Sequence, residues 1–144
     1  MKLDSEIDMT TTPNTPRLPI ALFIMRISLA LFLLPWVIEK FTKPEQTAKI
    51  FAHFYHITLP SGGAFAIGIL WAVLLLAFAA GFKKRISYGL VMLFHGAGTV
   101  FTIPKLLPFL ETYNHLFVAA IPTLGAMIAL YILRAHDNLF SIDR

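Results

Sequence analysis

The sequence predicts an all-α membrane protein in which four transmembrane helices form a compact bundle and one short amphipathic interfacial helix lies between the first and the second. Of the 144 residues, 57% are hydrophobic and only 14% are charged, whereas soluble domains average roughly 45–50% and about 25%. The mean hydropathy is +0.71. A soluble protein that buries every apolar helix would need a larger polar shell than this chain can supply.

Four apolar segments have the length that a bilayer requires, which is about 17–25 residues for a helix. A fifth segment, within residues 42–60, has a polar stripe at helical spacing and predicts the amphipathic helix, with Pro44 in its first turn and its end at Pro60 to Gly63. We expect residues 1–17 to form a flexible cytoplasmic tail, residues 18–133 the transmembrane domain, and residues 134–144 a second cytoplasmic tail. The four expected spans are Leu18 to Phe41, Ala64 to Ala80, Ile86 to Ile103 and Leu116 to Leu133.

The basic residues lie at the ends of the apolar runs and indicate orientation. Three adjacent ones, Lys83, Lys84 and Arg85, occupy the short connection between the second and third spans, so the positive-inside rule places this connection in the cytoplasm. With four spans, both termini are then cytoplasmic as well. We expect a multi-pass protein of the plasma (inner) membrane. The net charge of +4 is a topology signal and does not predict a nucleic-acid partner.

Arg26 lies well inside the first span, where a charged side chain is costly and is a functional-site hypothesis by default. At ~1.5 Å per residue, Arg26 lies about 12 Å above the cytoplasmic end of its span and His95 about 14 Å above the same end of the third span. Tyr88 and Thr99 are the neighbouring polar candidates. One interpretation is that backbone carbonyls and snorkelling toward the headgroups satisfy Arg26. The other is that Arg26, His95, Tyr88 and Thr99 bind an anion or the carbonyl of a quinone-like lipophile.

Near the opposite end, Glu39, Lys40, His53 and His56 are expected to form an outer polar cluster. An exposed polar stripe is the simplest interpretation, and the alternative is that His53 and His56 ligate a metal ion with Glu39 or Glu111. We predict no metal site, because the exposed stripe is the simpler interpretation, and no haem, because His95 has no second histidine at a similar depth.

Three segments, RISLALFLLPWVIEKF, PEQTAKIFAHF and the hairpin that closes on GFKKRISYGLVML, resemble the DoxX-like family of small four-helix membrane proteins over roughly residues 20–133. The resemblance implies a four-span bundle with an arginine early in the first helix and a lysine at its far end, matched by Arg26 and Lys40. Some family members are assigned as membrane subunits of thiosulfate:quinone oxidoreductase or as partners of redox-defence enzymes.

The sequence contains no cysteine, which removes thiolate chemistry from the chain, and it lacks any nucleotide-binding or nucleophile motif. We therefore assign no catalytic residue. We expect an accessory or binding subunit associated with a membrane redox system, with a partner protein or a second copy of the chain in the lipid bilayer. The alternatives are a quinone-handling oxidoreductase subunit with a lipophile or anion pocket at Arg26 and His95, and a small transporter. No cofactor is predicted within the chain itself, although a quinone or an anionic lipid would fit such a pocket.

Overall fold

A computed structural model describes residues 17–106 and 118–143, and within these ranges all regular structure is helical. Two helices, α1 (Arg17–Thr42) and α4 (Lys84–Leu106), contain segments long and apolar enough to cross a membrane. Two others are apolar but shorter, namely α3 (Gly63–Ala79) with 17 residues and α6 (Ala120–Ile132) with 13. The fifth described helix is α2 (Pro44–Tyr55).

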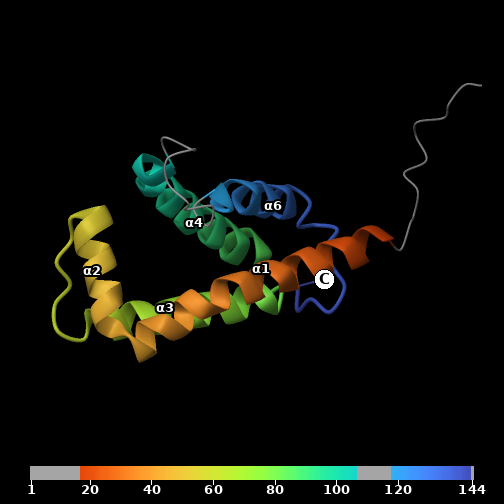
Figure 1. Ribbon diagram of the computed structural model, residues 1–144. Coiled ribbons are helices and arrows are strands. Elements are labelled where there is room, and N and C mark those ends of the chain that lie inside the picture. Colours follow the sequence, from red (N-terminus) through yellow and green to blue (C-terminus); the bar gives the residue numbers. More distant parts are fainter. Residues whose placement is uncertain (1–16, 107–117, 144) are drawn as a thin grey trace, which may run out of the picture.

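The four apolar helices, α1, α3, α4 and α6, are arranged in two pairs (Figure 1). α1 and α3 lie side by side, and α4 packs against α6. The two pairs meet where α3 passes into α4, whereas farther along α4 rises away from α1, and these two helices make no close backbone contact in the described ranges. α2 stands across the far end and contacts α1, α3 and α4. The molecule is therefore closed at one end and splayed at the other.

Apolar side chains from all four apolar helices form the core between the pairs. Leu22, Leu29 and Leu33 of α1 follow one another at helical spacing and meet Phe78 of α3 and Val91 of α4, all of them buried. The outer face of α3 is also apolar. Its exposed residues include Ile69, Leu70, Val73 and Leu76.

Most expected helix boundaries are confirmed to within a few residues, and the amphipathic helix begins at Pro44 as expected. The expected end of that helix is wrong, because α2 stops at Tyr55 and His56 adopts a left-handed conformation with φ 54°. His56 therefore lies outside the helical stripe of Glu45, Lys49 and His53. The expected fourth span starts at Leu116, which lies outside the described residues, and α6 is described from Ala120 onward.

Gly68 allows α3 to approach the end of α1. A Cβ atom at this position would lie 2.9 Å from Cζ of Phe41 and 3.1 Å from Cβ of Lys40, whereas a Cβ at Gly125 of α6 would meet nothing within 4 Å. Small residues at such crossings let two backbones approach closely in membrane helices. The α1–α3 contact therefore depends on the absence of a side chain at Gly68.

Replacing Gly68 by leucine is expected to lower thermal stability, because the added side chain must displace Phe41 or push the two helices apart. Overpacking of this kind costs about 1–3 kcal/mol. The matched control is Gly125→Leu, which should leave the melting temperature nearly unchanged. Thermal unfolding of the purified variants in detergent makes the comparison, and equal effects at the two positions would contradict the packing described for Gly68.

Candidate functional site

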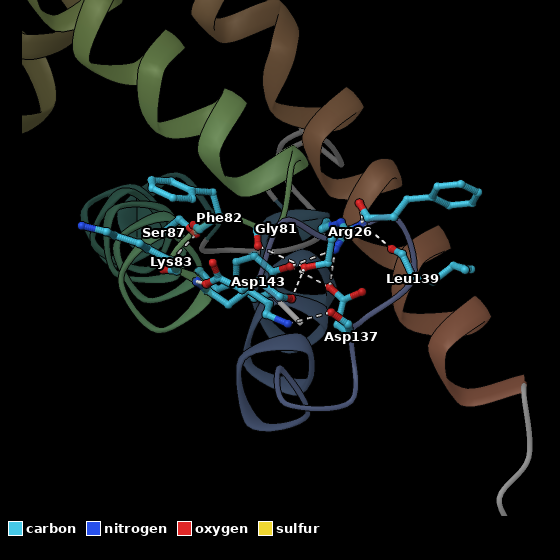
Figure 2. A network of polar contacts seen from close by, with 12 residues as sticks. Arg26, Gly81, Phe82, Lys83, Ser87, Asp137, Leu139 and Asp143 are labelled. Carbon is cyan, nitrogen blue, oxygen red and sulfur yellow. Dashed lines mark hydrogen bonds and ion pairs between the residues drawn. The ribbon is translucent and has the colours of Figure 1, made fainter.

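Arg26 has a counter-ion that lies after the last helix. Its Nη1 atom is 3.0 Å from Oδ2 of Asp137, and both side chains are completely buried. Asp137 belongs to the segment that follows α6 and turns back toward α1 and α3. Figure 2 shows the two side chains pointing toward one another. In the described part of the chain this is the only ion pair between side chains.

Further hydrogen bonds complete the surroundings of this pair. The hydroxyl group of Tyr88 donates to Oδ2 of Asp137 at 2.6 Å and lies 3.3 Å from Nη1 of Arg26. Nη2 of Arg26 donates to the backbone oxygens of Leu139 at 2.8 Å and Phe140 at 3.0 Å. Two buried atoms, Nε of Arg26 and Oδ1 of Asp137, have no protein partner in the described residues. We call Arg26, Tyr88 and Asp137 the anchor cluster.

Residues 137–143, which we call the strap, form hydrogen bonds with the helix ends around the anchor cluster. The backbone N–H groups of Ile142 and Asp143 donate to the oxygens of Ala80 and Gly81 at the end of α3, at 3.0 and 3.1 Å. Oδ2 of Asp143 accepts from the backbone N–H of Lys84, the first residue of α4, at 3.0 Å. Helix ends have unpaired backbone groups that need partners. The strap therefore holds α1, α3 and α4 together at the closed end.

Gly81 is the point at which the strap passes closest to the rest of the fold. It has φ 62°, and a Cβ atom there would overlap Oγ of Ser141 and lie 2.7 Å from Nη1 of Arg26. Any side chain would disturb both the strap and the arginine. Glycine is required here for its backbone conformation and for the close approach together.

Sequence reasoning missed Asp137, because residues 134–144 were assigned to the cytoplasm outside the bundle. The structure instead packs residues 137–143 against the helix ends. The available signal was an arginine in an apolar segment with no acidic residue within reach in that segment, together with a short C-terminal segment in which Asp137 and Asp143 flank the apolar residues Leu139, Phe140 and Ile142. An unpaired buried arginine predicts that a carboxylate reaches it from elsewhere in the fold.

A pocket of about 380 Å³ lies at the splayed end, between α1, α2, α3 and α4. Its walls are mostly aromatic. Phe32 and Trp36 come from α1, Trp71 from α3 and Phe94 from α4, while α2 closes one end with further rings. The aromatic lining residues are Phe32, Trp36, Phe51, Phe54, Tyr55, Trp71 and Phe94.

Several polar groups reach the same pocket. Nζ of Lys40 donates to the backbone oxygen of Trp36 at 3.0 Å and lies 5.9 Å from the ring centroid of Trp71. Nε2 of His95 is 3.3 Å from the backbone oxygen of Ala120, and its ring packs edge-on against Phe32. Burial raises the pKa of Tyr55, so its hydroxyl stays protonated at neutral pH. A pocket of aromatic walls with a few hydrogen-bonding groups is typical of sites for lipophilic molecules.

The four residues expected around one ligand fall into two separate places. Arg26 and Tyr88 belong to the anchor cluster, whereas His95 and Thr99 line the aromatic pocket, where the hydroxyl group of Thr99 donates to the backbone oxygen of His95 at 2.8 Å. Arg26 does not line that pocket. Arg26 and His95 therefore do not share one pocket, because Arg26 meets α4 at Tyr88, whereas His95 meets α1 farther along the helix, at Phe32. The backbone carbonyls expected to satisfy Arg26 are present, and they come from the strap.

The expected outer polar cluster is divided in a similar way. Glu39 and Lys40 line the aromatic pocket. His53 and His56 are exposed and do not line it. Within the described ranges no three histidine or acidic side chains come together as metal ligands, and Glu111, the other carboxylate considered for a metal, lies outside those ranges.

The anchor cluster leads to a prediction about stability. Replacing Arg26 by methionine leaves the Asp137 carboxylate buried without its partner, and Asp137→Leu does the same to the guanidinium, so each change is expected to cost about 3–5 kcal/mol. The double variant removes both charges and should be more stable than the sum of the single effects implies. Thermal unfolding in detergent measures all four proteins. Additive losses would show that the two side chains do not stabilise one another.

Comparisons with known proteins found no match: no protein-family model fits the chain, and no curated protein and no solved structure is similar to it. The function is therefore inferred from the contacts described above.

Proposed function

We propose that this chain is an integral membrane protein of the DoxX-like type that acts as an accessory or binding subunit of a membrane redox system, and that the aromatic pocket holds a lipophilic ligand such as a quinone. The observation that carries this proposal is the pocket itself, with rings from α1, α2, α3 and α4 around about 380 Å³. Rings of this kind contact a planar apolar molecule, and Lys40, His95 and Tyr55 supply hydrogen-bonding groups for its oxygens.

A membrane location is supported by the lengths of α1 and α4 and by the surface of α3. α3 has no charged residue, and Leu70 and Leu76 are each 71% exposed. Soluble monomers rarely leave a contiguous apolar face of this kind in water. In the proposed arrangement α1, α3, α4 and α6 all cross the bilayer in the plasma membrane. The described part of α6 covers ~20 Å at ~1.5 Å per residue.

The anchor cluster changes which binding site is proposed. Arg26 is already paired with Asp137 and with two strap carbonyls, so an anion or quinone site at Arg26 would require the strap to leave. The aromatic pocket needs no such change. Because the chain has no thiol, a partner protein would supply the electron-transfer group, and this chain would position the lipophile.

Ligand binding is expected to raise the melting temperature of the detergent-purified protein in the presence of a short-chain benzoquinone. A ligand at 100 times its Kd stabilises by about 2.7 kcal/mol. Trp71→Ala and His95→Leu should reduce the ligand-induced shift, because they remove a wall and a hydrogen-bonding group. The matched control is Ile69→Ala, an exposed α3 residue that should keep the shift. Native mass spectrometry would detect a co-purifying lipophile, and equal shifts in all variants would exclude this pocket.

The orientation can be tested on the cysteine-free chain. Arg85, exposed at the start of α4, is expected on the cytoplasmic side, and Ala52, exposed on α2, on the outer side. A cysteine introduced at position 52 should react with a membrane-impermeant maleimide in intact cells, and one at position 85 only after the membrane is opened. The reverse pattern would contradict the proposed topology.

A further inference from the structure

The strap has one side that faces the helices and one that faces outward. Its inner side provides the Asp137 carboxylate and the backbone groups that bind Arg26, Ala80 and Gly81. Its outer side includes the side chains of Phe140, which is 78% exposed, and Ile142, which is 65% exposed, as well as the polar side chain of Asn138. Two large apolar side chains are therefore held outward on a segment whose backbone is tightly bonded to the bundle.

The backbone at Phe140 is in a conformation that bulky residues rarely adopt. Its φ is 47°, in the left-handed region. This conformation lets its oxygen accept from Nη2 of Arg26 while the ring stays outside, where it contacts the ring of Phe23 with centroids 5.3 Å apart. Strained backbone conformations of this kind cluster at functional sites.

Cationic and aromatic residues flank the other end of the strap. The backbone N–H of Asp143 donates to the backbone oxygen of Gly81. Gly81 is followed in the chain by Phe82, which is 42% exposed, and Lys83. Nζ of Lys83 lies 5.7 Å from the centroid of the Phe82 ring, and Arg85 is also exposed. Figure 2 shows Phe82 and Lys83 on one side of the anchor cluster and Leu139 on the other. Exposed rings beside exposed basic side chains are typical of segments at a membrane–water interface.

We propose that the outer side of the strap is a lipid-binding surface. Phe140, Ile142 and Phe82 enter the boundary between headgroups and acyl chains, and Lys83 and Arg85 contact the phosphates of anionic phospholipids. The exposed basic residues Lys83 and Arg85 favour an anionic lipid over a neutral one. This inference rests on the proposed membrane location. The inference goes beyond the membrane location because it places residues 137–143 in the membrane–water interface, whereas the sequence alone predicts that they form a cytoplasmic tail.

Single cysteines in the cysteine-free chain can carry an environment-sensitive fluorophore at position 140 or 142. The protein is reconstituted in phosphatidylcholine vesicles, with or without phosphatidylglycerol, in which some acyl chains are brominated. We expect blue-shifted emission and at least two-fold stronger quenching by the brominated chains at positions 140 and 142 than at position 138. Asn138 is exposed on the same strap and is the matched control.

The lipid preference is tested by the double variant Lys83→Gln/Arg85→Gln. In the parent protein, quenching at position 142 should increase when phosphatidylglycerol is present, and this increase should be lost in the double variant. If the increase is unchanged, the two basic residues do not select anionic lipid. Gly81→Ala provides a separate check, because a side chain there displaces Ser141 and should reduce quenching at both strap positions.

Two controls separate the ways in which the inference can fail. A probe at position 70, on the exposed face of α3, reports whether the protein is in the bilayer at all. Quenching at position 70 with none at 140 and 142 would overturn the strap proposal alone, whereas no quenching at position 70 would overturn the membrane location. Blue-shifted emission at 140 without quenching, together with disulfide-linked dimers of the unlabelled position 140 cysteine variant, would show that a second copy covers this surface and would also overturn the proposal.

Discussion

The buried pair of Arg26 and Asp137 is the interaction on which the closed end of the molecule depends. Removing two charges from water costs several kcal/mol for each, and their attraction compensates only when hydrogen bonds satisfy the remaining atoms. Here Tyr88 and two backbone oxygens supply most of those bonds, and Nε of Arg26 and Oδ1 of Asp137 have no protein partner in the described residues. The compensation requires Asp137 to stay beside α1, and this requirement fixes the path of the strap. The ends of α3 and α4 then find their partners in the same segment.

The anchor cluster also explains why the two ends of the molecule differ. At the closed end the strap links α1, α3 and α4 through backbone bonds and one ion pair. At the splayed end no comparable link joins α1 to α4 in the described ranges, and α2 fills part of the gap. Tyr55 of α2 packs edge-on against Phe101 of α4, with ring centroids 4.9 Å apart. Aromatic side chains rather than charges hold this end together, which leaves space for the pocket.

This division agrees with the proposed function, in which the pocket binds a lipophile. The closed end keeps the relative positions of the helices, and the aromatic pocket lies where the helices diverge. Trp36 and Phe94 line the pocket and are also partly exposed on the outer surface. The groups needed for electron transfer would come from a partner. Lys40 and His95 would orient the bound molecule through hydrogen bonds.

The sequence by itself determined the helices. Apolar runs predict them because apolar side chains are excluded from water, and Pro44 and the glycines mark helix ends through local backbone geometry. It also indicated that Arg26 is exceptional. It did not identify Asp137, which is 111 positions away. It placed His95 with Arg26, because counting residues along each helix does not show how two helices are shifted relative to one another. Only the tertiary structure decided these points, since that shift and the return of the strap depend on packing between segments far apart in the chain.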